Sequence, residues 1–199
     1  HQVVPPVPTA ALVELVSDLL NNSMAVYEVG PFSSAVERVV MEWLGAVLGL
    51  GENAGGVMTS GGSIGNFTAL LAARQHQAGY DTWEHGSRDR PALAVMVSSE
   101  SHYSVARAVK IMGWGQEGII SIPVNERREI DVSSLERVYG EAVMQGKQVI
   151  ALIANACSTS TGSYDSLEEI AEFCRSKNLW LHVDAAHGGG AVLAPKYKH

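Results

Sequence analysis

The sequence predicts an α/β fold, a three-layer α/β/α arrangement in which helices cover both faces of a mainly parallel sheet. Short and almost continuously apolar segments recur along the chain, as strands of a sheet buried on both faces do. They alternate with segments of helical periodicity, the pattern of strand and helix units that builds a parallel sheet. The chain shows no internal repeat, coiled-coil heptad or low-complexity tract that would indicate another architecture.

Two amphipathic helices are expected first. Residues 9–20 place Leu12, Leu15, Val16 and Leu19 on one face, and Thr9 is the predicted N-cap. The second helix follows Pro31-Phe-Ser-Ser and ends at Gly49 to Gly51, and its apolar positions are Val36, Val39, Val40, Trp43, Leu44 and Val47. We expect residues 1–52 to form an N-terminal helical segment and residues 53–199 the sheet domain.

The remaining elements alternate in order. Strands are predicted over residues 55–60, 92–97, 118–124, 149–154 and 179–183. Helices are predicted over residues 63–77, 101–112, 133–145 and 166–176, and residues 79–91 are predicted to be a polar loop.

The composition excludes several classes of partner. The chain of 199 residues has 21 acidic and 14 basic side chains, a net charge of −7, which disfavours nucleic acid and anionic membrane surfaces. The longest apolar runs are too short to span a bilayer, and no signal peptide is indicated. Two distant cysteines, Cys157 and Cys174, indicate neither a disulfide framework nor a CxxC metal site. We therefore expect a cytoplasmic protein with no bound metal.

Ligands of a parallel sheet bind beyond the carboxyl ends of its strands, and a glycine-rich segment follows the first predicted strand. Thr59-Ser-Gly-Gly-Ser-Ile-Gly-Asn precedes a long helix, whose N-terminal N–H groups and dipole favour a phosphate. Ser63 is expected to cap that helix and to bind the phosphate. The alternative is an ordinary Gly-rich turn, because the segment is neither a Walker loop nor a GxGxxG fingerprint.

Two further candidates follow later strands. His102, in Ser98-Ser-Glu-Ser-His-Tyr-Ser, can stack on a planar ring or transfer a proton; alternatively it is a structural histidine. Thr159, in the hydroxyl-rich turn Ala156-Cys-Ser-Thr-Ser-Thr-Gly, can donate a hydrogen bond to a ring substituent. The alternative is that the hydroxyls of residues 158–161 bond only to loop backbone. Neither cysteine has a local base that would make it a nucleophile.

Asp184 ends the last predicted strand, in Leu-His-Val-Asp-Ala-Ala-His-Gly-Gly. A carboxylate in a buried cleft requires a cation. No lysine or arginine stands close to Asp184 in sequence except Lys196 and Lys198, near the end of the chain. A protonated pyridine nitrogen would meet this need, and Ala186 would then be small because a flat ring lies against it. Alternatively, Asp184 caps the following turn or pairs with a distant arginine.

Together these segments resemble the group II pyridoxal-phosphate-dependent amino-acid decarboxylases. The matching text is Gly30-Pro-Phe-Ser-Ser-Ala-Val-Glu with Trp43-Leu-Gly-Ala-Val-Leu-Gly-Leu, Thr59-Ser-Gly-Gly-Ser-Ile-Gly-Asn-Phe-Thr-Ala-Leu-Leu-Ala-Ala-Arg, Ser101-His-Tyr-Ser-Val, Ser160-Thr-Gly-Ser-Tyr-Asp-Ser-Leu and His182-Val-Asp-Ala-Ala-His-Gly. The resemblance implies an incomplete large domain of the fold-type I (aspartate aminotransferase-like) enzymes, pyridoxal 5'-phosphate as cofactor, an L-amino acid as substrate and a homodimer.

The resemblance also implies a role for each candidate residue. Gly62 and Ser63 would hold the cofactor phosphate, and His102 would stack on the pyridine ring. Thr159 would contact the oxygen side of the ring, Asp184 would pair with the pyridine nitrogen, and Ala186 would pack on the opposite ring face. His102 and Asp184 are therefore the expected catalytic residues.

One departure from the family pattern concerns the Schiff-base lysine, which follows a histidine in those enzymes. This sequence contains no His-Lys dipeptide, and neither Lys196 nor Lys198 stands in the family context. We therefore expect an inactive front part of a decarboxylase. The alternatives are another fold-type I enzyme (a carbon-carbon lyase, an aminotransferase or a desulfurase) or a non-catalytic scaffold.

Overall fold

The computed structural model describes residues 5–197 of the chain. Contacts divide the chain into two compact units, His1–Met58 and Thr59–His199. This division falls six residues after the end of the predicted helical segment (58 against 52), and the predicted domain boundary at 52/53 stays a prediction. Each unit is described by itself.

The first unit contains two helices, α1 (Pro8–Leu20) and α2 (Pro31–Val47), as the periodicity predicts. Each begins at a proline, whose fixed φ and missing N–H suit the first helical position. The N-cap of α1 is Val7, which makes no side-chain cap hydrogen bond, so the predicted cap at Thr9 is wrong. Pro8 starts the helix one residue earlier and leaves Thr9 inside its first turn.

The predicted strand over residues 55–60 is not formed; these residues are irregular in the structure. The N–H of Met58 donates to Glu37 Oε1 of helix α2 at 2.7 Å instead of to a neighbouring strand. Gly56 lies against the same helix, where a Cβ would come 2.8 Å from the sulfur of Met41. Residues 56–58 therefore lie along α2, and the side chains of Val57 and Met58 remain exposed.

The second unit contains the sheet, with four strands: β1 (Ala92–Ser98), β2 (Ile119–Ile122), β3 (Lys147–Asn155) and β4 (Trp180–Asp184). Their order is β2-β1-β3-β4 and every pairing is parallel. This confirms the predicted parallel sheet. Ser98 of β1 is the register partner of Ile122, and Asn155 of β3 that of Asp184, so these strands end at the same edge.

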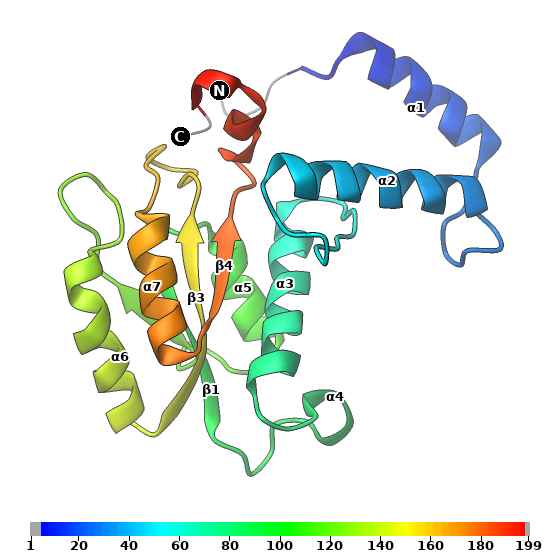
Figure 1. Cartoon of the computed structure of the whole chain (residues 1–199). Helices are drawn as coiled ribbons and strands as arrows, with labels where there is room; N and C mark the ends of the chain where they lie inside the picture. Colours follow the sequence, from blue (N-terminus) through cyan, green and yellow to red (C-terminus); the bar gives the residue numbers. More distant parts are fainter. Residues whose placement is uncertain (1–4, 198–199) are drawn as a thin grey trace. The chain divides into compact units, whose positions relative to one another are not determined.

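Helices join the strands, as the alternating pattern predicts (Figure 1). They are α3 (Gly62–Gln77), α4 (Thr82–His85), α5 (Tyr103–Ile111), α6 (Leu135–Met144) and α7 (Leu167–Lys177), with 3₁₀ turns at Val132–Ser134, Gly189–Leu193 and Pro195–Tyr197. Helix α4 lies in the segment predicted to be a loop. Asp81 is the N-cap of this helix and stabilises it, because its carboxylate accepts the N–H groups of Trp83 and Glu84 at 2.9 and 3.2 Å. Across residues 5–197, no helix combines the length and the apolar character that crossing a bilayer requires.

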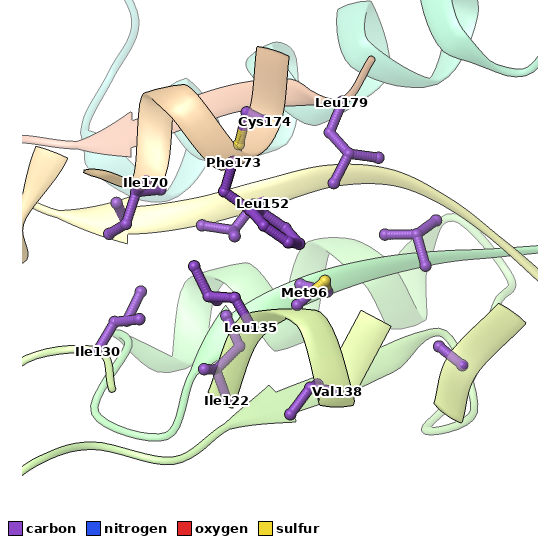
Figure 2. Packing of buried hydrophobic residues seen from close by; sticks show 13 residues of the cluster. Met96, Ile122, Ile130, Leu135, Val138, Leu152, Ile170, Phe173, Cys174 and Leu179 are labelled. Atoms are coloured by element: carbon purple, nitrogen blue, oxygen red, sulfur yellow. The ribbon is translucent and has the colours of Figure 1, made fainter. Parts of the chain in front are cut away.

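The core consists of two clusters of buried side chains, one on each face of the sheet. Figure 2 shows the first, in which Met96, Leu152 and Phe173 gather between the strands and helices α6 and α7. The second joins the opposite face to α3 and α5 through residues such as Leu70 and Val105. The three-layer arrangement predicted from the sequence is therefore confirmed. Burial of such side chains stabilises the fold by about 1.5–3 kcal/mol each.

Strand β4 presents alternate residues to the two faces. Leu181 packs against the α6/α7 cluster, whereas Trp180 packs against the α3/α5 cluster. His182 and Asp184 follow Trp180 at intervals of two residues, so they face α3. The same alternation that buries the strand therefore places an imidazole and a carboxylate against one helix.

Candidate active site

The candidate residues meet at the carboxyl edge of the sheet. His102 follows β1, Thr159 follows β3 and Asp184 ends β4. Three hydrogen bonds join the loop after β1 to the end of β3 and the loop that follows it. They are Ser101 Oγ to Asn155 Oδ1 at 3.3 Å, Ser158 Oγ to the Glu100 carbonyl at 3.0 Å and Ser160 Oγ to Glu100 Oε2 at 3.2 Å. The fold thus brings together segments that lie far apart in the sequence.

Asp184 is buried, with 8% of its surface exposed. Its Oδ1 accepts the N–H of Ala186 at 3.1 Å and its Oδ2 accepts from Asn66 Nδ2 at 2.8 Å. The first bond is the turn cap that was one alternative, but within residues 5–197 no arginine or lysine forms an ion pair with this carboxylate. Lys196 lies over the ring of Tyr197, and Lys198 is outside the described residues. Within the described part of the chain, this buried carboxylate is therefore held by neutral donors alone.

Asn66 lies in the first turns of α3 and was not among the predicted site residues. It connects Asp184 to side chains from two other segments. It is buried, and its side chain contacts Asp184, Ser104 and His182. The sequence signal was available in part, since Asn66 ends the glycine-rich segment and His182 stands two residues before Asp184. Sequence spacing alone does not show that α3 crosses β4 at this point.

His102 is half-buried and occupies the N-cap position of α5. Its Nδ1 accepts the backbone N–H of Ser104 at 3.3 Å and lies 2.8 Å from Ser104 Oγ. The ring of Tyr103 lies 4.1 Å away between centroids, tilted by 41°. His102 thus has the structural role that was its alternative, and the same bonds fix the orientation of its ring.

The glycine-rich segment begins helix α3, but not as predicted in detail. The helix begins at Gly62 and its N-cap is Gly61, at φ 151° with no side-chain cap bond. Ser63 is therefore not the cap; it lies inside the first turn, because only glycine readily adopts the φ that the cap position requires here. The N–H groups of Gly62 and Ser63 belong to the first turn, where a helix supplies no acceptor.

Gly62 and Ala186 adjoin, although 124 residues separate them in the sequence (186 against 62). A Cβ built on Gly62 would lie 3.0 Å from the Ala186 methyl group. Both residues are exposed, whereas Asp184, two residues before Ala186, is buried. Two small residues thus adjoin at the N-terminus of α3, and one of them donates its backbone N–H to the buried carboxylate.

The loop after β3 holds Thr159 in a half-buried position. The preceding Ser158 is buried, and its N–H bonds to the Ser163 carbonyl at 2.8 Å while its hydroxyl bonds to Glu100. Ser163 Oγ donates to the Arg128 carbonyl at 2.8 Å. The hydroxyl of Ser158 therefore does bond to backbone, but Ser160 Oγ donates to the Glu100 carboxylate at 3.2 Å, so the alternative holds only in part. The ring contact of Thr159 stays a prediction.

Burial sets the protonation of His182 and Cys174. Burial lowers the pKa of His182 below 6.5, against an opposing effect of the Asp184 charge. Burial also raises the pKa of the Cys174 thiol to about 11, so this cysteine is not a nucleophile at neutral pH. Both cysteines are free.

Comparison with known proteins agrees with the fold and with the site motifs. The family model of the pyridoxal-dependent decarboxylase conserved domain matches residues 7–199. An aromatic-L-amino-acid decarboxylase of Bacillus atrophaeus is 34% identical over 188 residues, which are 92% of this chain and 38% of that protein. The human cysteine sulfinic acid decarboxylase is 34% identical over 192 residues, 96% of this chain and 38% of that protein. The chain therefore spans less than two fifths of the length of these relatives.

Solved structures show the same fold. The crystal structure of mouse CSAD has a TM-score of 0.95 and 31% identity, covering 100% of this chain and 42% of that one. The glutamate decarboxylase domain of a Vibrio parahaemolyticus protein has a TM-score of 0.92 and 28% identity, covering 100% of this chain and 44% of that one. The predicted resemblance is confirmed, and so is the expectation of a fold-type I large domain. With the family model matching nearly the whole chain, this protein belongs to the pyridoxal-dependent decarboxylase family.

Proposed function

We propose that this chain forms the cofactor-binding part of an enzyme that uses pyridoxal 5'-phosphate to remove the α-carboxylate of an L-amino acid as carbon dioxide. The observation that carries the proposal is Asp184, a buried carboxylate that makes no ion pair within residues 5–197 and stands two residues before the exposed Ala186. A buried charge of this kind is costly unless a cationic group meets it. A protonated pyridine nitrogen is such a group.

The residues present fit this cofactor. Gly62 and Ala186 adjoin without room for further side-chain atoms between them, which suits a flat ring above. The first-turn N–H groups of Gly62 and Ser63 suit a phosphate, because they carry the positive end of the dipole of α3. In this proposal Asp184 holds the proton on the ring nitrogen, His102 orients the ring by stacking, and Thr159 donates to a ring oxygen.

The bound cofactor supplies an electron sink for the electron pair that remains when carbon dioxide leaves. The part of Asp184 is to keep the sink positively charged, and its burial strengthens that interaction because the local dielectric is low. His102 adds an imidazole beside the reacting centre that can move a proton. The burial of Asp184 and the N-cap position of His102 support these proposed roles.

Cofactor binding is tested by titrating the 199-residue chain with pyridoxal 5'-phosphate and following the absorbance of the cofactor. We expect reversible binding that sodium borohydride does not make permanent, because the chain has no His-Lys dipeptide. D184A should weaken binding about tenfold or more, the effect of losing a charge-assisted bond of about 1.5–3 kcal/mol. D89N removes a charge at an exposed site and should bind as the wild type does. Equal binding by D184A and the wild type would overturn the proposal.

The reaction is tested on the product of the natural gene, incubated with the cofactor and a panel of L-amino acids. Release of carbon dioxide that the D184A variant loses supports the proposed reaction. Binding of the cofactor with no release from any amino acid would overturn the reaction while leaving the cofactor site in place. Conversion of an amino acid without release of carbon dioxide would indicate another fold-type I activity.

A non-catalytic scaffold is the second candidate, and the absence of a His-Lys dipeptide from these 199 residues favours it. A scaffold should neither bind the cofactor nor change its assembly when the cofactor is added. Size-exclusion chromatography with and without pyridoxal 5'-phosphate separates it from the enzyme.

The same proposal includes a homodimer in the cytoplasm. Support for the dimer comes from α1, which buries none of its residues and leaves Leu12 66% and Leu19 78% exposed. An exposed apolar helix face of this kind is typical of a surface that contacts another protein chain. Support for the cytoplasm comes from the two free cysteines, which suit a reducing compartment.

A further inference from the structure

We propose that Asn66 is a positioning residue that sets both the tautomer of His102 and the orientation of the Asp184 carboxylate, through one amide group. The inference deepens the proposed function and rests on it for the meaning of the two positioned groups. It also makes a claim about the protein without cofactor, which can be tested separately.

The side chain of Asn66 uses both of its N–H donors and its carbonyl oxygen. Its Nδ2 donates to Asp184 Oδ2 at 2.8 Å and to Ser104 Oγ at 3.0 Å. Its Oδ1 lies 2.8 Å from His182 Nε2. An amide has two N–H donors and a carbonyl acceptor, so all three contacts are satisfied in one orientation. The reverse orientation would place the carbonyl oxygen against a carboxylate.

This orientation determines the protons of the neighbours. Ser104 Oγ accepts from Asn66, so its own hydrogen is available for His102 Nδ1 at 2.8 Å. The backbone N–H of Ser104 also reaches Nδ1, at 3.3 Å, and an N–H can only donate. Nδ1 is therefore an acceptor, and the proton of the neutral imidazole is on Nε2.

The position requires asparagine for reasons of chemistry. A serine or threonine at position 66 has a single donor and cannot serve both Ser104 and Asp184. An aspartate has no donor when ionised and would repel Asp184. A buried polar atom without a hydrogen-bond partner is costly, and Asn66 is 5% exposed. A short neutral side chain with two donors and an acceptor is what this site requires.

The amide positions the two groups and does not pass protons between them. Its N–H groups do not ionise in the physiological range. They donate to Asp184 and to Ser104, and Ser104 lies between Asn66 and the imidazole of His102. Loss of Asn66 should therefore disturb two separate properties, the tautomer of His102 and the binding of a cationic ring by Asp184. A residue that only stabilised the fold would change neither property selectively.

The test measures the imidazole tautomer in the chain without cofactor, by ¹H–¹⁵N long-range correlation spectra of ¹⁵N-histidine-labelled protein. The wild type should show His102 as the Nε2–H form. S104A removes the hydroxyl branch and should increase the Nδ1–H form several-fold, and S104T, which keeps a hydroxyl, should restore the wild-type spectrum. N66L removes both donors at similar size and should change the tautomer and also weaken pyridoxal 5'-phosphate binding about tenfold.

Controls separate the possible outcomes. N53L, at an exposed asparagine, should leave the tautomer and the binding unchanged. An Nδ1–H form in the wild type, or wild-type spectra in both N66L and S104A, would overturn the inference. If N66L does not fold, the spectra of S104A and S104T still test whether the Ser104 hydroxyl controls the tautomer of His102. If the wild type binds no cofactor while the tautomer changes as expected, the proposed function fails and the positioning role of Asn66 stands.

Discussion

At the scale of single residues, the site depends on buried polar groups that hydrogen bonds hold in place. Asp184, Asn66 and Ser104 are all buried, and each has hydrogen-bond partners from a different segment of the chain. An unpaired group at this depth would cost about 1–3 kcal/mol. This cost makes the network specific, because no other arrangement of these side chains satisfies the same donors and acceptors.

His182 leads to a pH-dependent stability. Burial keeps its pKa below 6.5 in the folded chain, whereas the unfolded chain has the ordinary value. As pH falls below about 6.5, the unfolded state binds a proton that the folded state does not, so the free energy of unfolding should decrease by up to about 1.4 kcal/mol per pH unit.

Urea denaturation between pH 7.5 and pH 5.5 measures this slope. H182Q, which keeps a donor for Asn66, should reduce it, and H85Q, at an exposed histidine, should not. A slope in H182Q equal to that of the wild type would show that His182 is not its source.

Gly188 is predicted to tolerate no side chain. A Cβ there would overlap the backbone N of Cys157 and lie 2.8 Å from the carbonyl carbon of Ala156. Since backbone atoms cannot move aside as flexible side chains do, G188A should lower the free energy of unfolding by about 1–3 kcal/mol. A Cβ on Gly190 would meet nothing within 4 Å, so G190A is the matched control. Equal thermal stability of the two variants would contradict this account.

At the scale of elements, loops at the carboxyl edge are joined by a few side chains that accept backbone N–H groups. Asp165, before α7, accepts from Ile130 N at 2.7 Å, Asn155 N at 2.6 Å and Asn155 Nδ2 at 3.0 Å. It thereby joins the end of β3 to the connection between β2 and α6. This arrangement supports the loop that contains Thr159.

D165A should therefore be strongly destabilising. It leaves the buried N–H groups of Ile130 and Asn155 without their acceptor, at about 1–3 kcal/mol each, so we expect a loss of about 2–5 kcal/mol. D131A provides the comparison, because Asp131 also accepts a backbone N–H, from Ser133, at an exposed turn, where loss of a cap costs about 1 kcal/mol. Chemical denaturation of both variants measures the difference, and D165A costing no more than D131A would refute the bridging role.

At the scale of the whole molecule, the two units differ in how they bury apolar surface. The second unit encloses its core between the sheet and four helices. The first unit leaves most of the apolar side chains of α1 and α2 exposed. A large exposed apolar face indicates an interaction surface, which is the basis of the proposed dimer.

The double variant L12K/L19K tests this surface. Both leucines are exposed, so the change should not lower thermal stability, but it should shift the chain toward monomer in sedimentation velocity over a concentration series. M144K introduces the same charge at an exposed methionine outside α1 and should leave the association unchanged. A wild type that is monomeric at every concentration would contradict the proposed dimer.

Much of the fold was predictable because its signals are local. Residues 92–97 and 149–154 are continuous apolar runs, and helices α1 and α2 have clear periodicity. The prediction failed at residues 55–60, whose apolar pair lacks a neighbouring strand, and at α4, where a single aspartate caps a short helix. Short segments depend on their neighbours more than on their own residues.

The sequence by itself determined most of the order of strands and helices and the segments that meet at the carboxyl edge, because periodicity and motifs are properties of neighbouring residues. The roles of Gly62, His102, Asp184 and Ala186 stay predictions. Only the tertiary structure decided that Asn66 bonds to both Asp184 and Ser104, and that Gly62 touches Ala186. These contacts join residues 38 to 124 positions apart (66 to 104, and 62 to 186). They exist because parallel strands end at one edge and α3 crosses the face on which His182 and Asp184 alternate.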